Sequence, residues 1–428
     1  MQTHFSLAAL ADPDMAQSEK ILRACVHCGF CTATCPTYLL TGDELDSPRG
    51  RIYLIKEMLE NGRAADARTA RHVDRCLSCL SCMTTCPSSV HYMHLVDHAR
   101  AHIEATYQRP FADKALRALL AFVLPRPTVF RFALRLAGAA RPFARYLPER
   151  LHAMLSLAPP NLPAPSDVDR PQVFPAQGAR QMRVALLNGC AQTVLDTRIN
   201  EATVRLLTRH GVEVVVAEGA GCCGALPHHL GKVDQSHVFA RRNIDAWTRE
   251  IETGGLDHIV INTSGCGTSV KDYGFMFRDE ADLADKAARI SALACDVSEL
   301  VDKLQFQRVA VPRLRVAYHS ACSLQHGQKV TREPVAALES AGFEVVAVPE
   351  GHICCGSAGT YNLLQSEMAD RLRARKVANI ESLAPQVIAA GNFGCMAQIG
   401  AGTAIPIVHT VELLDWATGG PKPEALTG

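Results

Sequence analysis

Residues 25–36 have the sequence CVHCGFCTATCP, and residues 76–87 have the sequence CLSCLSCMTTCP. In both stretches two residues separate each of the first three cysteines, and a fourth follows after three more residues, directly before a proline. A tight loop with this spacing can present three sulfur atoms to one centre, and soft thiolates suit iron–sulfur cores. A pair of zinc sites would leave the third cysteine and the Cys-Pro unexplained. The two stretches therefore predict two [4Fe–4S] clusters.

In runs of this kind, the fourth cysteine of each run ligates the cluster of the other run. The expected ligands of the first cluster are Cys25, Cys28, Cys31 and Cys86. The expected ligands of the second cluster are Cys76, Cys79, Cys82 and Cys35.

A helix is expected between the two runs. Ser47 as its cap and Pro48 at its first position predict a helix that extends to about Glu60. Arg49 and Arg51 near its start either offset the negative charge of the clusters or are surface charges.

The composition bounds the class of protein. The 428 residues include 17 cysteines, and 44 Lys and Arg against 43 Asp and Glu give a net charge of +1. That balance argues against a general nucleic-acid binder. We see no secretory signal and expect no transmembrane helix. Dense cysteine in a cytoplasmic chain, whose thiols stay reduced, indicates metal ligation.

The C-terminal half contains an internal repeat. Cys190 and Cys222 are 32 positions apart, as are Cys322 and Cys354. Each later cysteine of these pairs opens a Cys-Cys-Gly triplet, and a further cysteine follows about 40 positions on. Two copies of one domain explain this pattern. The candidate ligands of additional clusters, or of a redox site, are Cys190, Cys222, Cys223, Cys266, Cys322, Cys354, Cys355 and Cys395.

Strand-like runs alternate with helical patterns in both copies, which predicts a parallel sheet in each. The expected strands are 183–187, 212–216 and 258–261 in the first copy, and 315–318, 343–348 and 386–389 in the second. Each key cysteine then follows a strand, where such sheets bind ligands. The expected fold class is a multidomain α+β and α/β chain, with a helical bacterial-ferredoxin-like domain, a helical connector and two α/β domains.

The domain boundaries follow from these patterns. We expect a ferredoxin-type domain over 1–110, a basic helical connector over 111–157, a Pro-rich linker over 158–182, and the two repeats over 183–310 and 311–428. The connector is basic and amphipathic, so it suits either an anionic membrane surface or another subunit. Its prolines at 125, 127, 142 and 148 predict short helices.

The Cys-Cys-Gly repeats resemble the cysteine-rich CCG domain family. Members of that family occur in heterodisulfide reductase subunits and in iron–sulfur subunits of flavin-linked 2-hydroxyacid oxidases, and their full motif ends in Cys-x-x-Cys and can hold an unusual [4Fe–4S] cluster. Here Gly267-Thr268-Ser269 follow Cys266, and Met396-Ala397-Gln398 follow Cys395. The fifth cysteine is therefore absent from both copies.

The order of the parts is similar to that of glycolate oxidase (glycolate dehydrogenase) iron–sulfur subunits. This resemblance implies that an FAD-containing partner subunit oxidises glycolate to glyoxylate, beside a further flavoprotein-like subunit. The chain itself would hold no catalytic residue and would relay electrons toward a quinone-type acceptor, as a cytoplasmic protein peripheral to the cytoplasmic face of the inner membrane. The absence of a G-x-G-x-x-G loop after a strand agrees with this reading.

Two alternatives remain open at this stage. The chain could be the equivalent subunit of a lactate or glycerol-3-phosphate oxidising complex. It could also be a thiol-handling subunit similar to that of heterodisulfide reductase.

Several other residues carry weaker patterns. The first group is interpreted as a solvated helix face rather than a haem or zinc site, and consists of His91, His94, His98 and His102. A second group either tunes a cluster or lies in polar loops, and consists of His228, His229 and His352. Cys295 is expected to be an inert buried thiol.

Overall fold

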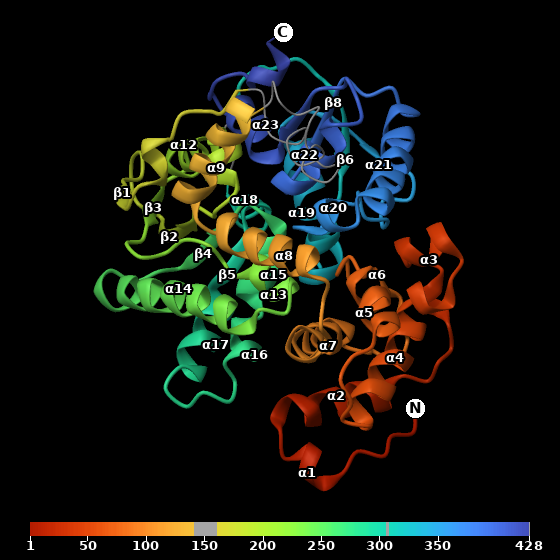
Figure 1. The fold of residues 1–428 in the computed structure, drawn as a ribbon. Coiled ribbons are helices and arrows are strands. Elements are labelled where there is room, and N and C mark those ends of the chain that lie inside the picture. Colours follow the sequence, from red (N-terminus) through yellow and green to blue (C-terminus); the bar gives the residue numbers. More distant parts are fainter. Residues whose placement is uncertain (141–160, 305–307, 428) are drawn as a thin grey trace.

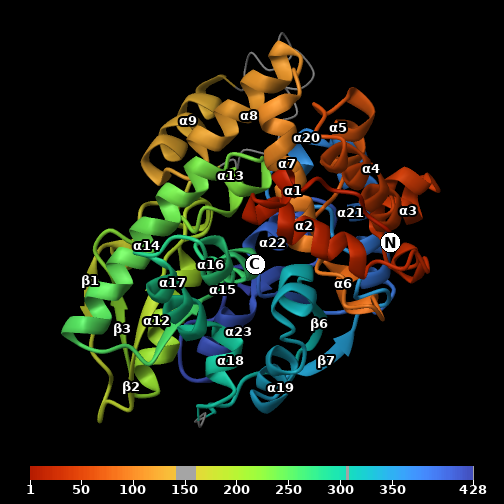
Figure 2. The ribbon, with the colours of Figure 1, turned by 90° about the horizontal axis from the view of Figure 1, so that it is seen from below.

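The computed structural model describes residues 1–140, 161–304 and 308–427. A helical N-terminal part lies against two α/β units, and Figures 1 and 2 show its red and orange helices beside both. Its helices are α1 (Leu7–Leu10), α2 (Pro13–Ala24), α3 (Pro36–Thr41), α4 (Pro48–Glu60), α5 (Ala67–Asp74), α6 (Ser81–Thr85) and α7 (Tyr92–Thr106).

Helix α4 begins where the sequence predicts. The Ser47 side chain accepts a hydrogen bond of 3.0 Å from the backbone N–H of Gly50, and Pro48 occupies the first helical position. Proline loses nothing there because the N–H at that position has no partner within the helix. The predicted cap and first residue are both confirmed.

Two further helices, α8 (Phe111–Val123) and α9 (Pro127–Ala140), pack on each other at one edge of the molecule (Figure 2). Pro125 lies between them and Pro127 opens the second, as expected for a segment that proline divides. The rest of the predicted connector, with Pro142 and Pro148, lies outside the described residues, as do residues 158–160 of the predicted linker.

The first α/β unit contains a five-stranded sheet with the strand order β1-β3-β2-β4-β5, in which β1 is antiparallel to β3 and the other pairs are parallel. The strands are β1 (Gln172–Phe174), β2 (Met182–Leu187), β3 (Val212–Val216), β4 (His258–Ile261) and β5 (Ala294–Asp296). Its helices are α11 (Gln192–Leu195), α12 (Arg198–Arg209), α13 (Ala225–His229), α14 (Val233–Thr253), α15 (Ser264–Lys271), α16 (Tyr273–Met276), α17 (Ala284–Leu293) and α18 (Val297–Val301).

The second unit contains a four-stranded sheet with the order β7-β6-β8-β9, and all its pairs are parallel. The strands are β6 (Arg315–His319), β7 (Glu344–Ala347), β8 (Val387–Ala390) and β9 (Ile407–His409). A π-helical turn, η5 (Ser323–Gln328), follows β6. The α-helices are α19 (Glu333–Ser340), α20 (Tyr361–Leu364), α21 (Ser366–Glu381), α22 (Phe393–Gly400) and α23 (Thr410–Ala417).

The predicted strands are confirmed, with shifts of one or two residues at some ends, and they pair in parallel in both sheets; only β1, which was not predicted, adds an antiparallel pair to the first sheet among the described residues. Strands β1, β5 and β9 were not predicted, because each has only three residues and so short a run shows no clear periodicity. The domain boundaries stay predictions.

The two sheets share one hydrophobic core. It contains buried residues of α12 and α18 from the first unit and of α19 and α23 from the second, so these helices form a layer between the sheets. The opposite face of the first sheet carries α14 and α17, and that of the second carries α21 and α22. Arg205 and Arg209 of α12 also form ion pairs with the buried Asp415 of α23, at 2.8 and 2.9 Å. A shared apolar core and these ion pairs therefore hold the two units together.

No helix in the described ranges has the length and the apolar character that a membrane span requires.

The shared core makes a testable prediction. Leu414 on α23 is buried in it, so Leu414→Ala removes packing that both sheets use, at an expected cost of about 2–5 kcal/mol. Hydrogen–deuterium exchange should accelerate in β2 and β3 as well as in β6 and β8. The exposed Val238→Ala on α14 is the control and should change neither sheet. Faster exchange confined to the second sheet would contradict a common core.

Candidate metal centres

The two cysteine runs fold into matching loops. His27 and Ser78 occupy equivalent positions, two residues after the first cysteine, and both have a positive φ, of 56° and 48°. Gly29 and Leu80, one residue after the second cysteine, also match, with φ of 87° and 62°. Non-glycine residues rarely adopt this conformation, which costs of order 1–3 kcal/mol per residue. The repeated strain turns successive thiols toward one point.

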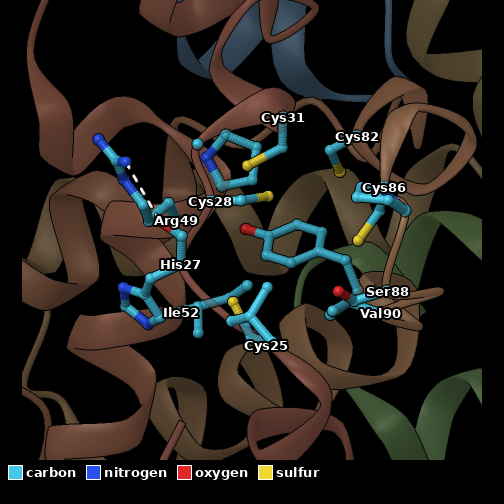
Figure 3. A pocket seen from close by; sticks show the side chains of 15 residues that line it. Cys25, His27, Cys28, Cys31, Arg49, Ile52, Cys82, Cys86, Ser88 and Val90 are labelled. Atoms are coloured by element: carbon cyan, nitrogen blue, oxygen red, sulfur yellow. Dashed lines mark hydrogen bonds between the residues drawn. The ribbon is translucent and has the colours of Figure 1, made fainter.

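The first run lines what we call the first pocket, shown in Figure 3. Sulfur atoms surround a common space that apolar side chains, including Ile52 and Val90, close from below. The cysteines that line it are Cys25, Cys28, Cys31, Cys82 and Cys86.

The second run lines the second pocket, together with Thr37, Arg51 and Tyr92. The cysteines that line it are Cys35, Cys76, Cys79 and Cys82. Cys82 thus lies between the two pockets. Cys86 of the second run reaches the first pocket and Cys35 of the first run reaches the second, which is the grouping that the predicted ligand sets require. The assignment of each ligand stays a prediction.

The residues of both pockets fit iron–sulfur clusters. Burial raises the pKa of the Cys79 and Cys82 thiols well above the usual range, and it raises the pKa of Cys31 to about 11. A buried thiolate needs positive charge beside it, and bound iron supplies that charge. Four convergent sulfurs in an apolar shell match the donor chemistry of a cubane.

Arg51 provides part of the compensating charge. Its side chain is only 1% exposed, its Nη1 lies 3.9 Å from Cys35 Sγ, and its Nη2 donates to Thr37 Oγ1 at 3.0 Å. The ion pair with the buried Asp46 measures 3.7 Å. The surface-charge interpretation is therefore wrong for Arg51, because its guanidinium lies inside the second pocket.

Arg49 differs from Arg51. It is a third exposed, its Nε donates to Glu44 at 2.7 Å, and it lines the rim of the first pocket. It is both a surface residue and a cluster-pocket residue.

The four cysteines of the first repeat lie together at the carboxyl ends of β2, β3 and β4. Cys222 interacts with Cys190 and Cys223, and Cys223 with Cys266. The neighbouring thiols of Cys222 and Cys266 hold the pKa of Cys223 well below its usual range, and those of Cys190 and Cys223 raise the pKa of Cys222. The topology thus assembles the candidate residues as expected.

The second repeat repeats this arrangement. Cys322 Sγ lies 3.7 Å from Cys354 Sγ, and Cys354 and Cys355 also interact. The ligand atoms of Cys355, Cys395 and His319 all lie within 4.8 Å of one another. Burial lowers the pKa of His319 to about 3, so its imidazole is neutral.

The glycine of each Cys-Cys-Gly triplet has a structural reason. Gly224 and Gly356 adopt φ of 84° and 93°, and each donates its N–H to the first sulfur of its triplet at 3.4 Å. A Cβ at Gly224 would lie 2.7 Å from Ser236 O, and one at Gly356 would lie 2.6 Å from Ala369 O. Only glycine permits both the conformation and the close helix.

The second pocket adjoins the second repeat. Leu77 and Cys79 pack in one buried cluster with Ile353 and Cys354, and Cys322 borders it. Thr84 Oγ1 also hydrogen-bonds to His326 Nδ1 at 2.8 Å. The thiols of the second run and of the second repeat are therefore neighbours in the fold.

The histidines of α7 do not form a solvated face, and that interpretation is wrong. His94 bonds to Asp272 Oδ1 at 2.8 Å, His98 to Ser18 Oγ at 2.6 Å, and His102 to Arg63 O at 2.9 Å. Each has a different partner, so they do not converge on a metal. His91, just before α7, is exposed and stacks on His94.

Charged residues beside these histidines are typical of a solvated helix face, which is why the sequence pattern was misleading. Asp97 and Arg100 on α7 are buried rather than exposed. Arg100 donates to Ser78 Oγ and to the Cys76 carbonyl, at 2.5 and 2.6 Å, and so it supports the second cysteine loop. The partners are distant in sequence, and the local pattern could not reveal them.

A ring nitrogen of His228 and one of His229, both on α13, lie 3.4 and 3.8 Å from the Asp97 carboxylate, and the His229 side chain is still 35% exposed. They join the first repeat to α7. His352 is half-buried, and its backbone carbonyl lies 3.2 Å from His326 Nε2. Cys295 is buried on β5, as expected, and burial raises its pKa to about 12.

Sequence reasoning missed three residues of these sites: His319, Lys376 and Tyr92. Lys376 is a buried cation near the thiols of the second repeat, and Tyr92 OH lies 3.9 Å from Cys76 Sγ. His319 had one available signal, its position three residues before Cys322, where the first repeat has Leu187.

Comparisons with known proteins agree with this geometry. Residues 21–90 match the family model of the 4Fe-4S dicluster domain, and residues 184–271 and 316–400 each match that of the cysteine-rich CCG domain. The chain is thus an iron–sulfur protein with a domain for two [4Fe–4S] clusters and two CCG domains.

Similar proteins narrow this class. The glycolate oxidase iron-sulfur subunit of Escherichia coli (strain K12) is 43% identical over 97% of this chain and 99% of its own length. The probable glycolate oxidase iron-sulfur subunit of Bacillus subtilis (strain 168) is 30% identical over 92% of this chain and 94% of its own length. The chain belongs to the family of glycolate oxidase iron–sulfur subunits.

More distant proteins share only part of this likeness. Lactate utilization protein A of Bacillus licheniformis is 29% identical over 55% of this chain and 99% of its own length. A crystal structure of a hypothetical protein from Helicobacter pylori superposes with a TM-score of 0.51 at 10% identity, covering 97% of this chain and 74% of that one, which shows a shared fold alone.

The contact of α7 with α13 should depend on pH. Burial alone would raise the pKa of Asp97, but His228 and His229 hold it well below 3.8, while Asp97 raises the pKa of His228 above 6.5 against the effect of burial. The ion pair therefore stabilises the fold fully between pH 3.8 and pH 6.5, the ordinary pKa values of the two groups. This stabilisation is lost as the pH rises through the raised pKa of His228, or as it falls through the lowered pKa of Asp97.

Hydrogen exchange in α7 and α13 measures this dependence. After correction for the intrinsic exchange rate, the protection of these amides in the wild type should decrease as the pH rises through the pKa of His228. Asp97→Asn should have weaker protection at pH 6 and a flatter profile. An unchanged profile in the variant would contradict the ion pair.

Proposed function

We propose that this chain is the electron-transfer subunit of a complex that oxidises glycolate. A partner subunit that contains FAD would oxidise glycolate to glyoxylate, with a further flavoprotein-like subunit in the complex. Bound [4Fe–4S] clusters would supply one-electron transfer, and the Cys residues of the two pockets would hold them. The electrons would leave toward a quinone-type acceptor. The two-electron oxidation is assigned to the partner because such chemistry needs a flavin or a nicotinamide.

The unequal exposure of the two pockets supports a relay. The first pocket opens at Cys28, which is exposed, and Val26 and Phe30 beside it are 66% and 60% exposed. The second pocket is covered by the second repeat through Cys354 and its neighbours. The first pocket is therefore accessible from outside the chain, and the second faces the interior of this chain.

We place the flavoprotein over the first pocket. Exposed apolar side chains around a redox site suit a protein partner, since the centres of interfaces are apolar and aromatic. Arg49 at the rim adds a positive charge that an acidic patch of the partner would match.

The substrate is tested on the purified complex. Glycolate, lactate and glycerol 3-phosphate are compared with an artificial electron acceptor, and we expect glycolate to be preferred. Preference for lactate would favour the alternative that the similarity to lactate utilization protein A raises. Preference for glycerol 3-phosphate would favour the other oxidising complex.

The docking surface gives a second prediction. Phe30→Glu places a charge in the proposed interface, so glycolate-dependent reduction of this chain should fall about tenfold or more, the scale of an interface hot spot. Its iron content should not change. Val238→Glu on α14 is the control, because Val238 is also exposed and does not line the pocket. Equal effects of both variants would refute this placement.

We also propose peripheral contact with an anionic membrane through α8 and α9. Their exposed apolar side chains, with Lys114 and Arg135 also exposed, form what we call the hairpin face. It consists of Phe111, Leu119, Phe122, Phe132 and Leu136. A face of this kind inserts apolar side chains at the headgroup level while cations meet anionic lipids.

The other arginines of these helices do not contribute to that face, in contrast to the expectation of a generally basic connector. Arg117 is buried and pairs with Asp74 at 2.9 Å, and Arg131 donates to the Thr193 carbonyl at 3.0 Å. They fix the hairpin to the rest of the chain.

Vesicle sedimentation tests this contact. The chain should bind vesicles that contain anionic lipid more than neutral ones, and Leu119→Glu with Phe122→Glu should reduce binding at least tenfold. Val238→Glu, on an exposed position of α14, should have no effect. Equal binding by the double variant would rule out the hairpin face as the contact.

A further inference from the structure

His319, the last residue of β6, is buried without a hydrogen-bond partner. Its side chain is 1% exposed, and neither ring nitrogen has a partner among the described residues. Buried polar groups are normally paired, because desolvation without a partner is unfavourable. By contrast, His409 at the end of β9 is also buried but donates to the Asn262 carbonyl at 2.8 Å and accepts from Val411 N–H. The unpaired state of His319 therefore calls for a ligand.

The surroundings of His319 define that ligand. A ring nitrogen and the sulfur atoms of Cys355 and Cys395 lie within 4.8 Å of one another, and the backbone brings Cys354 and Cys322 next to them. Neutral imidazole and thiolates together are donors for iron, zinc and copper rather than for hard cations. Asn392 also donates to Cys395 Sγ at 3.2 Å, which orients that sulfur.

The first repeat lacks the histidine donor. At the position of His319 it has Leu187, which packs in the hydrophobic core. A second difference lies on the helix that packs against each triplet. In the second repeat, Ala369 lies against Gly356, and Lys376 follows it seven residues later. In the first repeat, Ser236 lies against the equivalent glycine, and the neutral Asn243 follows it seven residues later.

Lys376 matters because of its charge. Its side chain is buried, its Nζ donates to the Glu350 carbonyl at 3.0 Å, and it lies in electrostatic reach of all four cysteines of the second repeat. A buried cation stabilises a centre whose thiolate ligands carry excess negative charge. Only the second repeat, then, has both a fifth donor and a compensating charge.

We propose that the second repeat holds an iron–sulfur centre with His319 as a nitrogen ligand beside Cys322, Cys354, Cys355 and Cys395, and that the imidazole takes the place of the absent fifth cysteine. The adjacent Cys79 would connect this centre to the second pocket. The inference deepens the proposed relay, but it concerns metal content and ligation rather than substrate.

The test uses the full chain, purified and loaded with iron and sulfide without oxygen. Two [4Fe–4S] clusters account for about eight irons per chain, and a third centre raises this to about twelve. His319→Leu copies the first repeat and should lower iron to about eight, while the electron paramagnetic resonance signals of the two N-terminal clusters remain. His352→Gln, a histidine of the same repeat outside the donor set, should keep about twelve.

Ligation is read from pulsed electron paramagnetic resonance of reduced protein with 15N-labelled histidine. The wild type should show a histidine nitrogen coupled to a cluster. His319→Cys supplies a thiol instead, so it should keep the iron and lose the nitrogen coupling. This variant also decides the question if His319→Leu fails to fold.

Three results would overturn the proposal: full iron in His319→Leu, no histidine coupling in the wild type, or zinc without iron beyond the first eight. None of these readings depends on glycolate turnover, so a failure of the proposed substrate would leave them intact.

Discussion

Each of the two N-terminal cysteine runs contributes a cysteine to the pocket of the other, and this exchange constrains how the N-terminal part folds. Cys86 lines the pocket of the first run and Cys35 lines that of the second. Neither pocket is complete without both runs, so the chain between them, including α4 and α5, must fold back in one way. If each pocket holds a cluster, the free energy of metal binding is folding free energy for the entire N-terminal part.

The surrounding helices serve this arrangement. Arg51 extends from α4 into the second pocket, and Arg100 extends from α7 to the loop that carries Cys76. Asp97, which lies on α7 like Arg100, contacts the first repeat through its ion pair with His228. The second repeat covers Cys79 directly. The N-terminal part thus holds the first repeat through the charge of Asp97 and the second repeat through apolar contacts of Leu77 and Cys79, and the common core between the sheets joins the two repeats.

Much of this could be predicted from sequence, for identifiable reasons. Cysteine spacing and β-branched runs are local patterns, so the two runs, the six main strands and the Ser47 cap were accessible. Burial of Asp97 and Arg100 was not, because each has partners in other segments. The proximity of His319 to Cys355 and Cys395 was not predictable either, since three separate loops bring these residues together. His319 was visible only as a departure from the symmetry of the repeats, where Leu187 stands in the first copy.

Electron paramagnetic resonance of the fully reduced chain, together with its metal content, reveals whether two neighbouring [4Fe–4S] clusters occupy the two pockets. Two [4Fe–4S] clusters that share the wall formed by Cys82 must be close, so we expect a spectrum broadened by spin coupling between them. The coupling should disappear in Cys86→Ser if that variant loses one cluster. The spectrum of a single isolated cluster in the wild type, or zinc in place of iron, would show that the two runs do not hold a pair of adjacent iron–sulfur clusters.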